Sequence, residues 1–393
     1  MDIFEKCYNF KEADEAKGKG IYPFFIPIDE VYGNKIKVDG KEMIMVGSNN
    51  YLGLVGDKRI NEAMKKAIDE FGSGTCGSRL LNGTLKKYVE LEKKIADFMG
   101  KEDAIILSTG YQTNLAIISA IASKNDVLIL DRLDHASLID ATRLSFSKVY
   151  KFRHNDMNDL ERILKSIPDD MGKLIVIDGV YSMDGDVADL PKIVELKKKY
   201  GARIFMDDAH GVGILGEKGQ GTAEYFDLID ETDIIMCTFS KSFASLGGFV
   251  AGEERVIEYI KHFGRPMIFS ASITPAAAAA AETALDIIKT EPERRKRLQE
   301  ISVMMKEEFQ KMGYKTGPTI TPIVPVIIGD DEKTFRLWYA LKEMGIFVTP
   351  VISPAVSPDN SRIRTSYTAT HSDEELQFVL KAFYEAGKGL NII

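Results

Sequence analysis

The chain has 393 residues, of which 45% are hydrophobic and 28% charged, and its formal net charge is −8. This length suits two or three domains, and an acidic balance without a basic stripe argues against nucleic acid as a partner. No apolar run reaches the roughly 18 residues of a membrane-spanning helix, and the charged N-terminus lacks a secretory signal. The cysteines Cys7, Cys76 and Cys237 have no metal-ligand spacing, so we expect a cytoplasmic protein without a metal site.

The first predicted segment is an arm over residues 1–45, where glycines and prolines between positions 18 and 27 interrupt any long helix. Amphipathic periodicity then predicts helices at 60–71 and 85–99. A nearly all-apolar stretch at 114–122 predicts a buried helix. These helices open the larger part of the chain.

Short β-rich runs alternate with helical stretches from residue 104 onward. Several runs are apolar on both faces, as buried strands of a mostly parallel sheet are. We therefore predict a large α/β domain over residues 46–280. The runs lie at 104–107, 127–130, 148–152, 174–180, 203–206, 234–238 and 249–251.

A second, smaller α+β domain is predicted over residues 281–393. Its pattern begins with a long charged helix at about 280–312. A last helix begins at Ser372, where Glu375 completes a capping box. Between these helices the pattern predicts strands at 323–328, 346–351 and 362–368 and a helix at 332–344.

The spacing GxGxxG occurs twice, at 72–77 and 211–216, and raises the alternative of a dinucleotide site. Such a site needs a strand before the glycines and a helix N-terminus after them. The first copy follows a helix, and the second runs into residues 217–221, which cannot open a good helix. Glycines for tight turns are the better interpretation of both copies.

The most informative pattern lies at the ends of two predicted strands. In open α/β sheets the ligand crevice is at the carboxyl ends of the strands. Each of these residues by itself more often forms part of a turn, caps a helix or faces solvent. Their combination in this order is much more specific for a ligand site. One strand leads into a carboxylate and a histidine and the next into hydroxyls and a lysine: Asp207, His210, Thr238, Ser240 and Lys241.

Pyridoxal-5′-phosphate (PLP) is the cofactor that needs this set. Its ring nitrogen stays protonated beside a buried carboxylate, and its aldehyde needs a lysine that can lose its proton near neutral pH. Its phosphate needs hydroxyls and free backbone N–H groups, which the turn Thr109-Gly110-Tyr111 at a helix start can supply. The sequence therefore predicts PLP attached to Lys241.

From about Tyr22 to its end the chain resembles the α-oxoamine synthases, a family of fold-type I PLP enzymes. The resemblance implies a large domain with a mostly parallel central sheet and a smaller C-terminal α+β domain. It rests on the blocks GSNNYLGL at 47–54, DHAS at 134–137, SMDGD at 182–186, DDAHG at 207–211, TFSK at 238–241 and SRIRT at 361–365.

The resemblance also implies roles for matched positions. Lys241 corresponds to the lysine that anchors PLP and acts as base, and Asp207 to the partner of the ring nitrogen. His210 matches the donor to the phenolic oxygen, and His135 the histidine stacked on the ring. Other matched positions contact the phosphate or the ring: Thr109, Gly110, Tyr111, Ser182, Thr238 and Ser240.

Two further matches concern the substrate and a second subunit. Asn49 and Arg364 correspond to groups that hold the substrate carboxylate; strand alternation puts Arg362 on the same face, and family position favours Arg364. Ser270, with Ser272, resembles a segment that reaches the phosphate of the neighbouring subunit. The resemblance thus implies a homodimer with shared active sites.

The implied reaction is a decarboxylating condensation of an amino acid with an acyl-CoA, giving an α-amino ketone, CoA and CO2. Three segments, at 22–25, 74–84 and 238–249, look most like the bacterial serine palmitoyltransferase branch, which favours serine with a long-chain acyl-CoA, as in sphingolipid base synthesis. Lys87 and Tyr88 stand where the family often has a histidine, which leaves the branch open.

The alternatives within the family are 2-amino-3-ketobutyrate CoA ligase (glycine C-acetyltransferase), 8-amino-7-oxononanoate synthase and 5-aminolevulinate synthase. They differ in the amino acid, which is glycine or alanine, and in the acyl donor. The alternative of another class is an aminotransferase, which releases neither CoA nor CO2. A non-catalytic subunit is a third hypothesis, and the presence of Lys241 argues against it.

Overall fold

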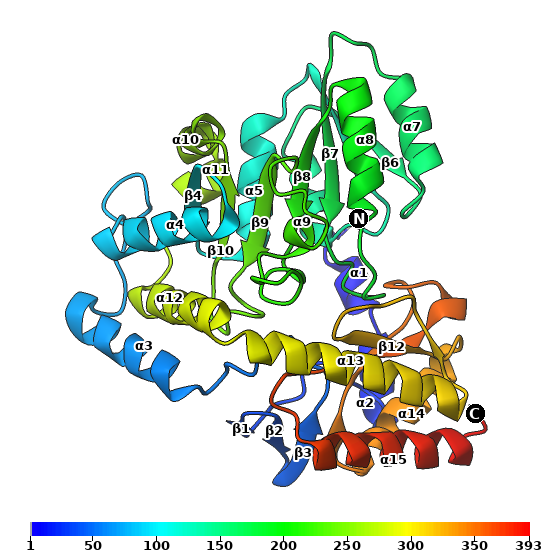
Figure 1. The fold of residues 1–393 in the computed structure, drawn as a ribbon. Coiled ribbons are helices and arrows are strands. Elements are labelled where there is room, and N and C mark those ends of the chain that lie inside the picture. Colours follow the sequence, from blue (N-terminus) through cyan, green and yellow to red (C-terminus); the bar gives the residue numbers. More distant parts are fainter. Residues whose placement is uncertain (1) are drawn as a thin grey trace.

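A seven-stranded sheet lies at the centre of the larger part of the molecule in the computed structural model, which describes residues 2–393. Its strands are β4 (Asp103–Leu107), β5 (Asp126–Asp131), β6 (Lys148–Phe152), β7 (Gly172–Asp178), β8 (Arg203–Asp207), β9 (Ile234–Thr238) and β10 (Gly248–Gly252). They lie in the order β4-β10-β9-β8-β7-β5-β6 (Figure 1). Strands β5, β6, β7, β8 and β9 all pair in parallel, and β10 is antiparallel to both of its neighbours, β4 and β9.

Both faces of this sheet are buried. Neighbouring residues of one strand, such as Ile105 and Ile106 or Phe205 and Met206, point into different hydrophobic clusters. One face packs on α5 (Gly110–Ile121), α6 (Ala136–Thr142), α10 (Glu254–Phe263) and α11 (Arg265–Ile268). The other packs on α3 (Lys58–Phe71), α4 (Lys86–Met99), α7 (Met157–Lys165), α8 (Leu190–Tyr200), α9 (Thr222–Tyr225) and α12 (Pro275–Thr290).

The direction of the strands gathers polar segments at one edge of the sheet. Parallel pairing brings the carboxyl ends of β5, β7, β8 and β9 together. Strand β4 runs the same way, because β4 and β9 are both antiparallel to β10. The segments that follow these strands therefore meet at the carboxyl edge, where a ligand crevice is expected.

The C-terminal part has a four-stranded sheet of order β11-β12-β15-β14. The last helix begins after Ser372 with the predicted capping box, since both Ser372 and Glu375 accept the expected backbone N–H groups. The strands are β11 (Lys315–Thr316), β12 (Ile323–Ile327), β14 (Thr349–Val351) and β15 (Arg362–Ser366). The helices are α13 (Pro292–Met312), α14 (Asp331–Glu343), α15 (Asp373–Gly389) and the short 3₁₀ helix η1 (Pro358–Asn360).

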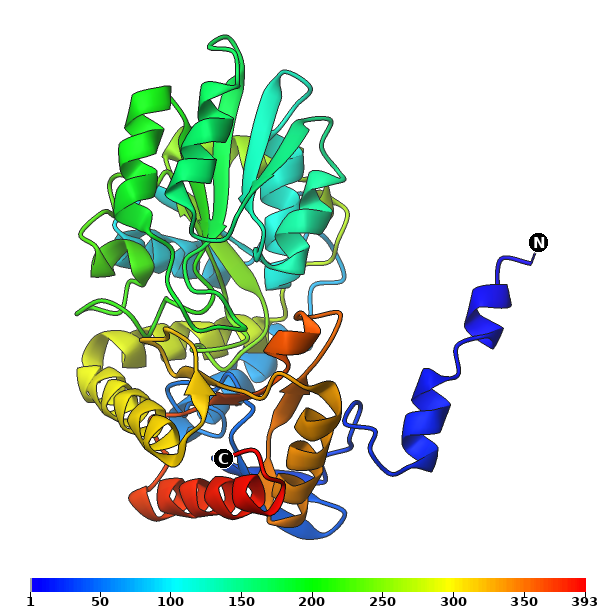
Figure 2. The same ribbon diagram turned by 90° about the vertical axis from the view of Figure 1, so that its right-hand side faces the viewer.

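A third sheet pairs three N-terminal strands with a strand from the C-terminal part. It consists of β1 (Glu30–Tyr32), β2 (Lys35–Val38), β3 (Lys41–Met45) and β13 (Ile346–Phe347), and β13 pairs in parallel with β3. Helices α1 (Glu5–Tyr8) and α2 (Glu12–Gly18) bury no residue and lie apart from the body, in dark blue in Figure 2. The division at residues 45 and 280 stays a prediction.

Two predicted elements differ from the structure. The single helix at 280–312 is wrong: α12 ends at Thr290 and α13 starts at Pro292, because proline lacks an N–H and disfavours a helical residue before it. The single strand at 346–351 is also wrong, since β13 and β14 belong to different sheets. Within residues 2–393, no helix has the length and apolar character needed to cross a bilayer.

Candidate active site

A cavity of about 270 Å³ opens at the carboxyl edge of the large sheet. Its walls come from the segments that follow β4, β7, β8 and β9 and from the start of α6. The structure thus brings together residues that are up to 138 positions apart in the sequence, from Thr109 to Gly247. The predicted site residues that line it are Thr109, Gly110, Tyr111, His135, Ser182, Asp207, His210, Thr238, Ser240 and Lys241.

Asp207 ends β8 and is buried. Asn114 Nδ2, from α5, donates to its Oδ2 at 2.7 Å, and the Ala209 amide donates to its Oδ1 at 3.1 Å. Both donors are neutral, so they aim the carboxylate without cancelling its charge. Asn114 was not predicted as a site residue. Its only signal in the sequence is that a polar residue stands inside a mostly apolar helix, and that signal is weak.

Lys241 follows β9 on a loop flanked by the buried rings of Phe239 and Phe243. Burial lowers the pKa of Lys241, and the charge of Asp207 opposes this shift. An apolar surrounding therefore favours the uncharged amine, which is the form that can attack a carbonyl or remove a proton.

His210 is held by a tyrosine that the sequence analysis missed. Its Nδ1 lies 2.7 Å from the Tyr51 hydroxyl, and both residues are buried. Burial, with the positive charge of Lys241, lowers the pKa of His210 well below its ordinary value, so the ring is neutral. When Tyr51 donates to Nδ1, the proton of His210 is on Nε2.

The same tyrosine hydroxyl connects His210 to the predicted substrate residues. It lies 3.1 Å from Asn49 Oδ1, which accepts from Arg364 Nη2 at 3.0 Å. The hydroxyl has a single proton, so it donates either to Asn49 or to His210, and the proton of His210 is on Nε2 in the second case. Neither Asn49 nor Arg364 lines the 270 Å³ cavity, but this chain of contacts links both to it through His210. Tyr51 lies inside the NNYL segment, and only its tertiary contacts reveal its part in the site.

The two arginines of β15 have different partners. Arg362 forms an ion pair with Asp184 at 2.6 Å and donates to the Met183 carbonyl at 3.0 Å. Arg364 Nε instead donates to the Ser182 carbonyl at 2.7 Å, and its contacts are with neutral oxygens. Arg364 therefore keeps a positive charge for a carboxylate, which favours it over Arg362 as the substrate group.

His135 is the N-cap of α6 and lies beside an unexpected carboxylate. Its Nδ1 is 2.7 Å from the Ser137 hydroxyl, and its amide donates to Asp178 Oδ2 at 3.1 Å. Burial lowers the pKa of His135, opposed by Asp207, so the ring that faces the cavity is neutral. Burial, with the nearby charge of Asp207, raises the pKa of Asp178 well above its ordinary value.

The N-terminus of α5 forms the anion-binding end of the cavity. Thr109 caps this helix by accepting from the Gln112 amide at 3.1 Å, and the first-turn amides have no partner within the helix. A Cβ at Gly110 would lie 2.7 Å from the Thr238 side chain, so only glycine lets the helix approach β9 this closely. The hydroxyls of Thr238 and Ser240 lie 2.9 Å apart beside it.

Two other expectations have different outcomes. Ser270 is not among the lining residues, and its contact with a neighbouring subunit stays a prediction.

The second glycine motif folds over Asp208, whose carboxylate accepts from the Thr222 amide and hydroxyl at 2.7 and 2.6 Å. Helix α9 after it has four residues, so the interpretation of tight turns holds there. Within residues 2–393, no group of three or more His, Cys, Asp or Glu is placed to hold a metal ion.

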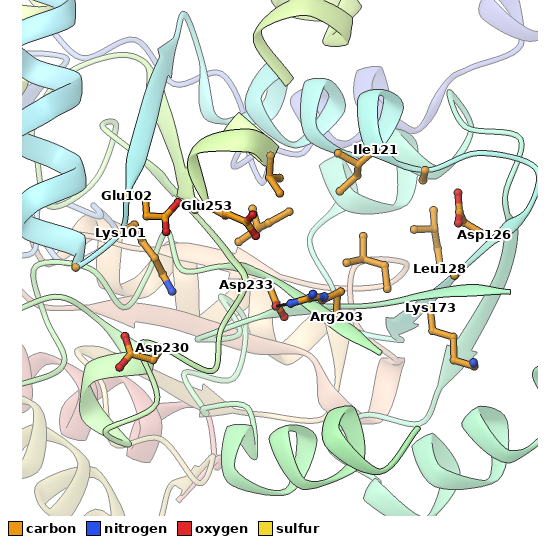
Figure 3. Close-up of a pocket in the computed structure, with 17 residues that line it drawn as sticks. Lys101, Glu102, Ile121, Asp126, Leu128, Lys173, Arg203, Asp230, Asp233 and Glu253 are labelled. Atoms are coloured by element: carbon orange, nitrogen blue, oxygen red, sulfur yellow. Dashed lines mark hydrogen bonds and ion pairs between the residues drawn. The ribbon is translucent and has the colours of Figure 1, made fainter. Parts of the chain in front are cut away.

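A larger cavity, of about 550 Å³, lies at the opposite edge of the sheet and contains none of the predicted site residues. Its charged groups are mostly satisfied by each other or by the backbone. Arg203 and Asp233 pair at 2.5 Å and lie together in Figure 3, and Lys101 donates to the Thr232 carbonyl at 2.7 Å. Most of the charge in this cavity is therefore already paired.

The residues at the carboxyl edge fit PLP. Asp207 supplies a buried carboxylate for the ring nitrogen, His210 a neutral donor for the phenolic oxygen, and Lys241 an amine for the aldehyde. The capped start of α5, with the Thr238 and Ser240 hydroxyls, supplies donors for a phosphate. The individual roles of these residues stay predictions.

The chain is similar to known proteins over its whole length. Residues 41–383 match the family described as aminotransferase class I and II. The serine palmitoyltransferase of Sphingobacterium spiritivorum is 46% identical over 98% of this chain and 97% of its own. The 8-amino-7-oxononanoate synthase of Thermoanaerobacter pseudethanolicus is 41% identical over the same shares of the two chains.

A solved structure extends this similarity to the fold. Serine palmitoyltransferase from S. paucimobilis with bound PLP and myriocin has a TM-score of 0.96 to this chain, at 36% identity over all of both chains. The predicted fold class and the predicted cofactor are thereby confirmed. The chain belongs to the aminotransferase class I and II family and, within it, to the α-oxoamine synthases, which are PLP-dependent C-acyltransferases.

Proposed function

We propose that this protein condenses serine with a long-chain acyl-CoA, releasing CO2 and CoA and forming an α-amino ketone. The observation that carries the proposal is the full-length similarity to serine palmitoyltransferases, at 43–46% identity. The site adds a chemical reason, because Arg364 and Asn49 offer a charged donor and an amide for an amino-acid carboxylate.

The residues of the cavity divide the work of the reaction. Bound PLP supplies an electron sink for the negative charge that forms at the amino-acid Cα. Asp207 would keep a proton on the ring nitrogen, and His210, with its proton on Nε2, would donate to the phenolic oxygen. Lys241, as an uncharged amine, removes the Cα proton and later returns a proton to the product.

Other residues bind and orient the substrates. Arg364 and Asn49 hold the carboxylate until it leaves as CO2. His135 would stack on the cofactor ring and orient the thioester, and the start of α5 would hold the phosphate. Burial lowers the pKa of His135, so the ring would take this position uncharged.

The protein as proposed is a homodimer in which Ser270 contacts the phosphate bound by the other subunit. Light scattering tests the assembly, and we expect twice the mass of one chain. Mixing Lys241→Ala with Ser270→Ala subunits tests the sharing of sites. Recovery of activity above either parent supports shared sites, and a monomer contradicts the assembly.

An amino-acid and acyl-CoA screen tests the reaction. Carboxyl-labelled serine, glycine and alanine are each combined with acetyl-, succinyl-, pimeloyl- and palmitoyl-CoA, and labelled CO2 and free thiol are measured. We expect the highest kcat/KM for serine with palmitoyl-CoA. Preference for alanine with pimeloyl-CoA would instead support the second candidate, 8-amino-7-oxononanoate synthase, whose relatives reach 41–43% identity.

The screen also separates synthase from aminotransferase. An aminotransferase keeps the carboxyl label in an amino or keto acid and releases no thiol. That outcome, with any of the three amino acids, overturns the synthase proposal while leaving the PLP site intact.

A further inference from the structure

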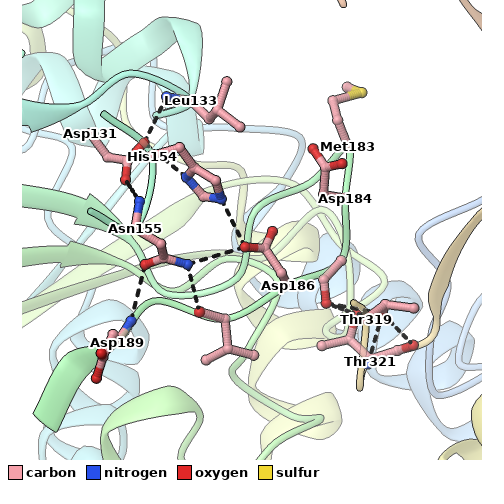
Figure 4. A network of polar contacts seen from close by, with 12 residues as sticks. Asp131, Leu133, His154, Asn155, Met183, Asp184, Asp186, Asp189, Thr319 and Thr321 are labelled. Carbon is pink, nitrogen blue, oxygen red and sulfur yellow. Dashed lines mark hydrogen bonds and ion pairs between the residues drawn. The ribbon is translucent and has the colours of Figure 1, made fainter. Parts of the chain in front are cut away.

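His154 lies between two carboxylates in the segment that joins β6 to α7. Its Nδ1 is 3.0 Å from Asp131 Oδ1, and its Nε2 is 2.8 Å from Asp186 Oδ2 (Figure 4). A carboxylate can only accept, so both ring nitrogens must donate, and only the imidazolium does so. Burial would lower the pKa of His154, but the hydrogen bonds to both carboxylates raise it to about 10.

The two carboxylates belong to different parts of the chain. Asp131 ends β5, is fully buried, and also accepts the backbone amides of Leu133 and Asn155. It is therefore a fixed anchor on the large sheet. Asp186 lies on the β7–α8 loop, residues 179–189, so His154 ties this loop to the carboxyl edge.

The β7–α8 loop is fixed from its other side as well. The Thr319 and Thr321 hydroxyls each donate to the Gly185 carbonyl at 3.0 Å. Figure 4 shows both threonines beside the loop that carries Asp184 and Asp186. Gly185 has a φ of +70°, and a Cβ there would lie 2.4 Å from the Ile323 carbonyl oxygen. The loop thus fits closely between the large sheet and the C-terminal part.

The same loop contacts the arginine proposed to bind the substrate. Its Ser182 carbonyl accepts from Arg364 Nε at 2.7 Å, and its Asp184 pairs with Arg362. A shift of the loop would therefore displace the guanidinium of Arg364. At its start the loop also contacts Asp207, since the Gly179 amide donates to the Asp207 backbone carbonyl at 2.8 Å. The Asp207 carboxylate itself is held by Asn114 and the Ala209 amide, so its position depends less on the loop.

We propose that His154 is a positioning residue for amino-acid recognition: as an imidazolium between Asp131 and Asp186, it fixes the β7–α8 loop and through it Arg364. The inference rests on the proposed function in that Arg364 binds the substrate carboxylate. His154 also lines an open cavity whose walls carry charged residues: Asp156, Glu161, Asp189, Lys192, Glu195 and Lys199. Two neutral groups contact His154 or its partner. The Tyr181 ring lies edge-on with its centroid 4.4 Å away, and Asn155 Nδ2 donates to Asp186 at 3.2 Å.

The test compares His154→Gln with wild-type holoenzyme. Glutamine keeps one polar contact but cannot carry the charge or donate to both carboxylates. We expect the KM for the amino acid to rise about tenfold, as for the loss of one charged hydrogen bond, with kcat and the KM for acyl-CoA within about twofold. Binding of serine without acyl-CoA, followed by the visible absorbance of the holoenzyme, should weaken by the same factor.

Two matched variants separate positioning from general destabilisation. His262, an exposed histidine on α10 near Glu258, serves as control, and His262→Gln should change neither measurement. Asp186→Asn breaks the contact from the loop side and should reproduce the effect, which keeps the test decisive if His154→Gln folds poorly. In an Arg364→Lys background, His154→Gln should add less than about twofold, because it acts through Arg364.

Unchanged serine binding in both His154→Gln and Asp186→Asn would overturn the proposal. So would equal weakening of PLP and of serine, because the effect would then not pass through Arg364. Failure of the proposed function is a separate outcome, in which the wild type releases neither CO2 nor thiol. In that case the binding titration still tests the role of His154, with whichever amino acid the wild type binds.

Discussion

The two edges of the large sheet carry similar residue types with opposite outcomes. At the amino edge, Asp233 forms ion pairs with both Arg203 and Lys197, and the Arg203 side chain is 71% exposed. At the carboxyl edge, Asp207 is buried and held by neutral donors, and desolvation lowers the pKa of Lys241. Both edges have cavities, and the one with charged pairs is the larger.

This difference teaches what makes an edge reactive. At the amino edge, burial would raise the pKa of Asp233, but Lys197 and Arg203 lower it. Charges that form such ion pairs neutralise one another and leave little field for a ligand. Buried charges held by neutral donors keep that field, and burial shifts the pKa of Lys241 and His210 toward uncharged forms. Cavity size alone does not indicate which edge carries the chemistry.

The largest expected effect is the loss of Lys241. Lys241→Ala removes both the cofactor anchor and the base, so we expect kcat/KM to fall by about 10³-fold or more. Lys197→Ala, at the amino edge, should change kcat/KM by less than about threefold. Steady-state rates of thiol release measure both variants, and similar losses in the two would contradict the contrast between the edges.

The next effect separates the two arginines of β15. Arg364→Lys should raise the KM for serine by about 10- to 100-fold, because an ammonium cannot replace the fork of contacts to a carboxylate. Arg362→Lys should instead lower the thermal stability, since it weakens a buried pair with Asp184, and leave the KM nearly unchanged. Steady-state kinetics and thermal unfolding of both variants test this assignment. A raised KM in Arg362→Lys with an unchanged KM in Arg364→Lys would assign carboxylate binding to Arg362.

A smaller effect concerns Tyr51. Tyr51→Phe removes the hydroxyl that selects the proton position on His210, at a cost of about 1–1.5 kcal/mol, or roughly tenfold in kcat. The apolar ring remains, so we expect little change in unfolding temperature. Wild-type kcat in Tyr51→Phe would show that His210 needs no such partner.

The smallest effect is a pH dependence of stability that differs between the two edges. The pKa of His154 is about 10 in the fold against an ordinary 6.5, so the folded state holds the proton more tightly. Its stabilisation is complete below about pH 6.5 and is lost as the pH rises through 10. Unfolding temperatures of wild type and His154→Gln should therefore converge over this range.

A matched variant at the amino edge sharpens that measurement. Arg203→Gln breaks an exposed pair worth at most about 1 kcal/mol, and its effect should shrink in high salt and stay flat with pH. A gap between wild type and His154→Gln that stays constant from pH 6.5 to 10 would contradict the charged state of His154.

Local signals made much of the fold predictable. Alternating and continuous apolar runs located the strands of the large sheet, and the Ser372–Glu375 capping box located the start of α15. The break at Pro292 was missed because two adjoining helices share one charged pattern. Strands β13 and β14 were merged because the single residue between them, Val348, leaves no distinct sequence signal.

Site residues that directly follow a strand were predictable from the sequence. Residues that reach the site only through contacts between distant segments were not. Asp207 and Lys241 stand at strand ends, and the structure gathers them as expected. Tyr51 and Asn114 contact His210 and Asp207 across 159 and 93 positions of sequence, which no local pattern encodes. Asp178 was missed for the same reason, since it lies beside Asp207 only through the pairing of β7 with β8.

The pairing of β3 with β13 also sets an order of events during synthesis. Val46 N donates to the Phe347 carbonyl and Asn34 reaches Glu375, contacts that span about 300 residues of chain. Strands β1 to β3 can pair with one another early, yet β3 lacks its other neighbour, β13, until residues 346–347 have emerged from the ribosome. The large sheet, which ends at residue 252, can form in the meantime.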